Sequence, residues 1–144
     1  MSDRPSWRGD RREFMGSCAL CVGAVALVGT AQGCAIDNLL QDTAVDLSLH
    51  PSLEEIDVTV FVDVGLRQPV AITRVGPEAA DFLVTNTECT HLSCQVEREG
   101  AGFLCPCHSS RFALDGGYQS GPAEDDLTGY AFEIDGEIMT IHAA

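Results

Sequence analysis

The sequence contains no lysine, and aromatic residues make up only 6% of it, with a single tryptophan. Its eight basic residues, all arginine, face 22 acidic ones, so the formal net charge is −14. A chain this acidic repels the phosphates of nucleic acids, whereas a basic partner protein fits its charge. Because aromatic rings are scarce, we also do not expect a large aromatic-lined pocket for a small molecule.

Cysteine, in contrast, is abundant, and seven cysteines in 144 residues indicate a disulfide, a metal site or both. The length suffices for one domain. Since 45% of the residues are hydrophobic and 21% are charged, the chain has the composition of a folded protein and not of a disordered one.

The first quarter of the chain differs in charge from the rest. Residues 1–33 carry four arginines and three acidic residues, whereas residues 34–144 carry four arginines and nineteen acidic residues. Residues 15–36 contain no charge at all, and a basic start before an apolar run is typical of an export signal. The run is also long enough to cross the roughly 30 Å hydrocarbon core of a membrane. We therefore predict a signal or membrane anchor in residues 1–36 and one folded domain in residues 37–144.

The segment Asp10-Arg11-Arg12-Glu13-Phe14-Met15 resembles the twin-arginine export signal, in which an arginine pair, any residue, phenylalanine and an apolar residue precede a mildly apolar region. That resemblance implies export of a protein already folded around a cofactor. An arginine pair in front of a Sec-type signal is the alternative. Three fates of the segment stay open: retention as an anchor, cleavage near Ala31 or Gly33, and lipidation of Cys34.

The rest of the chain predicts a small all-β domain. Val58, Val60, Val62 and Val64 alternate with other residues at period two, as in a half-buried strand. Asp135-Gly136 is a hairpin signal. Further strands are expected in residues 45–49, 70–75, 82–85, 130–134 and 138–142, and a short helix is possible only in residues 77–81. The pattern favours an antiparallel sandwich or barrel, interrupted in residues 88–123 by loops with few strand signals.

Those loops contain every cysteine of the predicted domain. One reads Cys89-Thr90-His91-Leu92-Ser93-Cys94, and the other reads Cys105-Pro106-Cys107-His108-Ser109-Ser110-Arg111-Phe112. Each supplies a cysteine, a histidine and one extra cysteine. Two cysteines and two histidines could form a tetrahedral zinc site, although zinc would leave the two extra cysteines unexplained.

The two loops resemble those of the Rieske iron–sulfur family, in its high-potential, disulfide-bearing branch, and the resemblance extends from about Val58 to the end of the chain. It implies one 2Fe-2S cluster in which two histidines replace two cysteines on one iron. Carried over residue by residue, it places Cys89 and Cys105 on the inner iron and His91 and His108 on the outer one.

The same resemblance pairs Cys94 with Cys107 in a disulfide between the loops. A disulfide requires an oxidising compartment, and the predicted export signal independently points to one. Neutral imidazole donates less charge than thiolate, which raises the reduction potential, and its free nitrogen can carry a proton.

Of the positions near the expected ligands, some match the family and others differ from it. Ser110 resembles the family serine whose hydroxyl bonds a cluster sulfide and raises the potential, while Phe112 stands where quinol-oxidising members usually have tyrosine. We therefore predict a potential below that of tyrosine-bearing members. Ser93 and Ser109 replace residues that are commonly glycine, so they are strained if the backbone needs a positive φ. Gly121-Pro122-Ala123 resembles the proline loop that shields the cluster.

The resemblance implies a membrane-associated electron carrier or oxidoreductase subunit on the outer, periplasmic face of the membrane. It would pass electrons from a quinol or a partner redox centre to a cytochrome, with His91 and His108 as the exchange face. The alternatives are the small subunit of a periplasmic molybdenum oxidase such as arsenite oxidase, a ferredoxin of a ring-hydroxylating oxygenase, and a structural metal module. No nucleophile outside the metal site is expected, and His50 and His142 are expected to be exposed.

Overall fold

The structure is a computed structural model that describes residues 41–143. The predicted signal or anchor in residues 1–36 therefore lies outside the described residues. Within residues 41–143 the chain forms ten β-strands and two short 3₁₀ helices, which confirms the predicted all-β fold. No helix in this part of the chain has the length and apolar character needed to cross a membrane.

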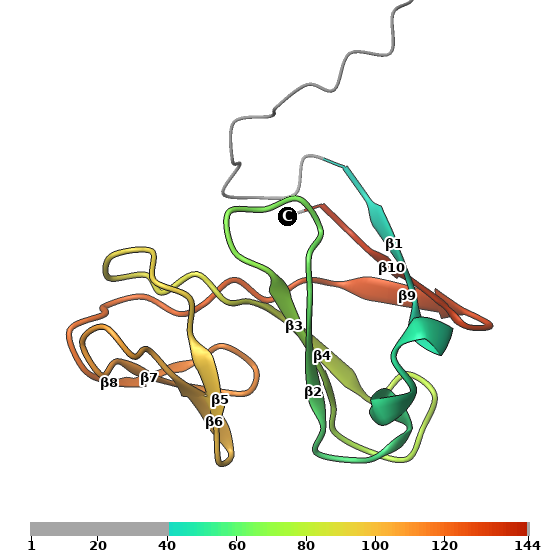
Figure 1. The fold of residues 1–144 in the computed structure, drawn as a ribbon, viewed down its shortest axis with the longest axis horizontal. Coiled ribbons are helices and arrows are strands. Elements are labelled where there is room, and N and C mark those ends of the chain that lie inside the picture. Colours follow the sequence, from blue (N-terminus) through green and yellow to red (C-terminus); the bar gives the residue numbers. More distant parts are fainter. Residues whose placement is uncertain (1–40, 144) are drawn as a thin grey trace, which may run out of the picture. The chain divides into compact units, whose positions relative to one another are not determined.

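The strands form three antiparallel sheets, which Figure 1 shows as separate groups. The first sheet has the order β1 (Thr43–Asp46), β10 (Ile138–Ile141), β9 (Phe132–Asp135), and the second has the order β2 (Thr59–Val62), β3 (Val70–Arg74), β4 (Phe82–Asn86). The third consists of β5 (Glu97–Glu99), β6 (Gly102–Leu104), β7 (Arg111–Ala113) and β8 (Tyr118–Ser120). The helices η1 (Leu47–Leu49) and η2 (Pro51–Glu54) connect β1 to β2.

Strand β3 separates two hydrophobic cores. Successive side chains of a strand point to opposite faces of its sheet. Val70 and Ile72 accordingly join the core shared by the first two sheets, whereas Ala71 joins the core beneath the third sheet. All three are fully buried. The third sheet therefore packs against a strand that is already buried on its other face.

Arg98 on β5 links the third sheet to the second. Its guanidinium donates hydrogen bonds to the Thr59 hydroxyl, at 3.0 Å, and to the carboxylate of Asp57 just before β2. The Thr59 hydroxyl in turn lies 2.8 Å from that of Thr73 on β3. Since Arg98 also donates to the carbonyl of Gly100, one side chain ties the β5–β6 turn to the neighbouring sheet.

Three of the expected elements differ from the structure. The strand expected in residues 45–49 ends at Asp46, whose side chain accepts the backbone N–H of Ser48 at 3.0 Å and starts η1. Residues 77–81 form a turn and not a helix, because Asp81 folds back to accept the N–H of Glu78. The segment expected to have few strands contains the whole third sheet.

Candidate metal centre

Two loops of the third sheet follow one hydrogen-bond scheme. The first cysteine loop (residues 89–94) lies between β4 and β5, and the second (residues 105–110) joins β6 to β7. In each, the N–H of the leading cysteine donates to the carbonyl five residues later, Cys94 or Ser110, at 2.8 Å. The carbonyl of the same cysteine accepts the N–H four residues later at 2.9 Å. The loops are therefore equivalent turns that hold their leading cysteines in matching positions.

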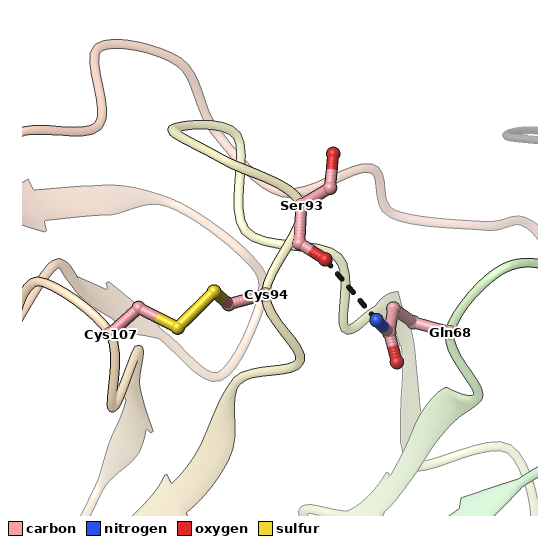
Figure 2. Close-up of a disulfide and its surroundings, with 4 residues drawn as sticks. All are labelled: Gln68, Ser93, Cys94 and Cys107. Atoms are coloured by element: carbon pink, nitrogen blue, oxygen red, sulfur yellow. Dashed lines mark hydrogen bonds between the residues drawn. A yellow bond between two sulfur atoms is a disulfide. The ribbon is translucent and has the colours of Figure 1, made fainter.

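The fourth residue after each leading cysteine has a left-handed backbone. Ser93 has a φ of 58° and Ser109 a φ of 63°, which confirms the strain expected at both serines. Ser93 is held at two atoms: Gln68 donates to its carbonyl at 3.2 Å, and Arg67 donates to its hydroxyl at 3.3 Å (Figure 2 shows the Gln68 bond). The segment before β3 thus fixes the first cysteine loop to the second sheet.

Cys89 and Cys105 are the two free cysteines of the described residues, and both are buried, with 2% and 1% of their surface exposed. Burial raises the pKa of the Cys89 thiol, and the adjacent Cys105 thiol contributes to the rise. Two thiols that are buried side by side without forming a disulfide are a donor pair suited to a metal.

The histidines of the two loops lie next to each other. The ring centroids of His91 and His108 are 4.8 Å apart, and their planes are nearly perpendicular. His91 is half-buried and His108 is exposed. The Nδ1 atom of His91 is buried and has no hydrogen-bond partner in the part of the chain that the structure describes. A buried imidazole nitrogen without a partner is satisfied by a bound metal, so this atom fits a ligand role.

A disulfide joins Cys94 to Cys107, the same pair that the resemblance implies, and it links the two cysteine loops (Figure 2). The sulfurs of Cys94, Cys105 and Cys107 lie within 4.8 Å of one another. Since disulfide sulfurs are not thiolates, this group is not itself a ligand set. It shows instead that the cross-link lies directly beside the buried thiols.

A third segment, residues 121–126, lies against both cysteine loops, and we call it the cover segment. Gly121 has a φ of 104°, and a Cβ atom there would lie 2.5 Å from the Cα of Ser110, so only glycine fits. The Ala123 N–H donates to the Ser110 hydroxyl at 3.0 Å, and both residues are buried. The Thr90 hydroxyl donates to the carbonyl of Asp125 at 2.7 Å. The structure thus places the predicted proline loop beside the donors.

Ser110 is fully buried, and its oxygen accepts the Ala123 N–H. A hydroxyl that accepts one bond still has its own proton to donate. The proton of this hydroxyl is therefore available for donation, which is what the role implied by the resemblance requires of it.

Sequence reasoning missed the contacts made by Gln68, Thr90 and Tyr118, because each joins segments that no local pattern connects. It was wrong about two histidines. His50 is half-buried at the end of η1, and His142, also half-buried, lies 3.0 Å from the Asp42 carboxylate. Neither is close in sequence to a cysteine of the site.

Comparison with known proteins identifies the class of this site. The profile of the Rieske [2Fe-2S] domain family matches residues 52–131, which is more than half of the chain. The chain belongs to this family and is a Rieske electron-transfer protein whose cofactor is one 2Fe-2S cluster. The buried thiols, the adjacent imidazoles and the unpartnered nitrogen described above fit that cofactor.

The similar proteins include iron-sulfur or Rieske subunits of ubiquinol-cytochrome c reductase and of the cytochrome b-c1 complex. The ubiquinol-cytochrome c reductase iron-sulfur subunit of Blastochloris viridis is 37% identical over 84 residues, which cover 54% of this chain and 46% of that protein. The mitochondrial cytochrome b-c1 complex Rieske subunit of Saccharomyces cerevisiae is 40% identical over 95 residues, or 64% of this chain and 44% of that protein. The chain thus spans less than half of either relative.

A solved structure agrees with the fold. The plasma membrane Rieske protein PetC3 from Synechocystis PCC 6803 has a TM-score of 0.50 and 29% sequence identity. The similarity covers 68% of this chain and 92% of that one. Nearly the whole of that PetC3 chain therefore shares its fold with about two thirds of this chain.

Proposed function

We propose that this chain is an exported, membrane-associated Rieske protein that takes one electron at a time from a quinol or a partner redox centre and passes it to a cytochrome. The observation that carries the proposal is the convergence of the two cysteine loops. They bring two buried thiols and two adjacent imidazoles together beside a disulfide. When bound, the cluster supplies one-electron oxidation and reduction.

The depth of each donor supports its assignment. Cys89 and Cys105 are buried, so they are proposed to hold the inner iron. His108 is exposed and His91 half-buried, so they are proposed to hold the iron nearer the surface. Leu92, beside His91, has 61% of its surface exposed, which makes this end of the domain an apolar, accessible tip. A partner that contacts the tip meets the imidazoles first.

The imidazoles also give the site a means of moving protons. A ligand histidine keeps one ring nitrogen away from the metal, and that nitrogen can hold or release a proton. His108 is exposed and can exchange this proton with water or with a bound donor. Because a reduced centre holds protons more tightly, the reduction potential should fall as the pH rises. This behaviour suits a donor, such as a quinol, that gives up protons with its electrons.

Charge supports a basic partner. Each arginine in residues 41–143 is bonded to a neighbouring group: Arg67 to Glu88, Arg74 to the carbonyls of Gly76 and Pro77, Arg98 to Asp57, and Arg111 to Glu99. Most of the acidic side chains in residues 41–143 therefore have no arginine partner among the described residues, including the exposed Glu124 and Asp125 of the cover segment. A partner with a basic face would be attracted to this end, more strongly at low salt.

Export is proposed from two separate features. The arginine pair and apolar run in residues 1–36 resemble a twin-arginine signal, and the domain assigned to residues 37–144 contains a disulfide that persists only outside a reducing compartment. A retained apolar run would hold the protein at the outer face of the membrane. Cleavage near Ala31 or Gly33 and lipidation of Cys34 are the alternatives to be distinguished.

The experiment is a spectroscopic test of the full chain. The purified protein should be coloured, and its reduced form should give the electron paramagnetic resonance spectrum of mixed nitrogen and sulfur coordination. His91→Ala and His108→Ala should abolish that spectrum, whereas His142→Ala, outside the site, should leave it unchanged. A colourless protein, or a spectrum that persists in both ligand variants, would contradict the proposal.

One observation favours a second candidate, the small subunit of a periplasmic molybdenum oxidase. Phe112 is fully buried at the position where quinol-oxidising members usually have tyrosine, so the site lacks a hydroxyl there. A subunit of this kind would co-purify with a large partner chain and would not respond to inhibitors of a quinol site. A quinol-linked protein would respond to such inhibitors.

A further inference from the structure

The cover segment is hydrogen-bonded to both cysteine loops, but its two ends are bonded to a residue outside these loops. Thr90 of the first loop donates to the carbonyl of Asp125, and Ser110 of the second loop accepts the N–H of Ala123. These bonds lie in the middle and later part of the segment. To hold the whole segment in place, a further contact must restrain its beginning and its end.

Tyr118 on β8 holds both ends. Its hydroxyl donates to the carbonyl of Gly121 at 2.8 Å, and its backbone N–H donates to the Asp126 carboxylate at 2.7 Å. The first bond restrains the start of the cover segment and the second restrains its end. The second is also strengthened by the charge of its acceptor.

We propose that Tyr118 is a positioning residue for the metal centre, acting by holding the cover segment so that the Ala123 N–H orients the Ser110 hydroxyl. With its oxygen occupied by Ala123, that hydroxyl can turn its proton only toward its remaining neighbours. If the segment moves away, the hydroxyl rotates freely and donates less often to the centre. The effect on the reduction potential rests on the proposed function, whereas the effect on the segment does not.

The structure separates this role from a role in core packing. Phe112, beside Tyr118, is fully buried and fills the core under the third sheet, whereas 39% of the Tyr118 surface is exposed. The two rings meet edge to face with centroids 6.4 Å apart. Tyr118→Phe keeps the ring contact and removes only the hydroxyl, so the core remains packed.

The first test is native-state hydrogen exchange of the Ala123 amide in the full chain as it is purified. Tyr118→Phe should accelerate this exchange about threefold. This corresponds to a small net free energy for the lost hydrogen bond, because water can reach the Tyr118 hydroxyl. Asp126→Ala should do the same from the other end, while Asp126→Asn, which keeps an acceptor oxygen but loses its charge, should accelerate the exchange less than Asp126→Ala. Unchanged exchange in both Tyr118→Phe and Asp126→Ala would overturn the proposal.

The matched control is the other tyrosine. The hydroxyl of Tyr130 accepts a long bond of 3.4 Å from Asn86 and has no hydrogen bond to the cover segment among the described residues. Tyr130→Phe should therefore leave the exchange of the Ala123 amide unchanged. An equal acceleration in Tyr130→Phe would mean that the effect is general loosening, and it would overturn the assignment to Tyr118.

The second test is a double-mutant cycle on the reduction potential with Ser110→Ala. Tyr118→Phe alone should lower the potential, and it should have no further effect in the Ser110→Ala background, because the two residues act through the same hydroxyl. An equal drop in both backgrounds would overturn the proposed route through Ser110. If the protein lacked a Rieske spectrum, the proposed function would fail, but the hydrogen-exchange result would still decide whether Tyr118 holds the segment.

Discussion

The ring of Phe112 meets the ring of Tyr118 edge to face across β7 and β8, with centroids 6.4 Å apart. Phe112 is fully buried in the core that also contains Cys89 and Cys105. Its ring therefore lies in the same packed cluster as the two free thiols.

Phe112→Tyr is expected to raise the reduction potential. A hydrogen bond to a ligand sulfur withdraws charge from the centre and favours its reduced form. The rise would be about 60 mV if the bond favours the reduced form tenfold. Redox titration of the two proteins at one pH measures it. Phe103→Tyr, on the paired strand β6, adds the same hydroxyl to the same core and serves as the control. An unchanged or lower potential in Phe112→Tyr would refute the expectation.

Removal of the disulfide is expected to shorten the life of the metal centre. The Cys94–Cys107 bond closes a loop with a sequence separation of 13 residues, and a cross-link of this length stabilises a fold by about 3 kcal/mol. The Cys94→Ala/Cys107→Ala double variant should bleach faster than the wild type in the presence of a chelator. A phosphine reductant should accelerate bleaching of the wild type and leave the rate of the variant unchanged. Equal lifetimes in wild type and variant would contradict this account.

The two left-handed serines provide a paired test of strain. Ser109→Gly is expected to raise the free energy of unfolding by up to about 1 kcal/mol. A left-handed backbone costs a non-glycine residue about 1–2 kcal/mol, and the greater freedom of glycine in the unfolded chain offsets part of the gain. Ser93→Gly should gain less, because it also loses the bond from Arg67 to the Ser93 hydroxyl. Urea unfolding of both variants measures the difference, and a larger gain for Ser93→Gly would be evidence against it.

Asp42 should make part of the stability depend on pH. The N–H of Ala143 and the ring of His142 bond its carboxylate, and together they lower its pKa. Since the folded pKa lies below the unfolded one, about 3.9, this stabilisation is complete above that value and is lost as the pH falls through the folded pKa. Asp42→Asn should therefore be less stable than the wild type at pH 7 and closer to it near pH 2.

The control for this measurement is Asp135→Asn, an exposed carboxylate in the β9–β10 hairpin. It should follow the wild-type dependence of stability on pH, including any contribution from acid-driven loss of the metal. Parallel curves for Asp42→Asn and Asp135→Asn between pH 7 and pH 2 would show that Asp42 contributes nothing.

The strand with the clearest alternation, β2, was predicted correctly, whereas the short strands of the third sheet were missed. Val60 and Val62 on β2 pack toward the first core while Phe61 between them is exposed, so burial on one face leaves a period-two pattern. The strands of the third sheet have only three residues each, too few to show a period. Their pairing depends on distant contacts such as that of Arg98 with Asp57, which lies 41 residues away.

The same distinction applies to the site. The proposed donor residues stand close together in two short loops, so their spacing and the family resemblance single them out as candidates. The residues that position them are separated by longer stretches of chain: Gln68 lies 25 residues before Ser93, and Thr90 lies 35 residues before Asp125. Such contacts form only after the sheets have packed, and no local sequence pattern predicts them.

Arg98 on β5 bonds Asp57 and Thr59. These bonds hold the sheet that carries the cysteine loops to the sheet that begins at β2. A nitroxide label placed on the exposed face of β2 would thus keep a constant separation from the paramagnetic centre. Distances measured by pulsed dipolar spectroscopy from that label to a bound cytochrome would then report where the electron leaves the protein.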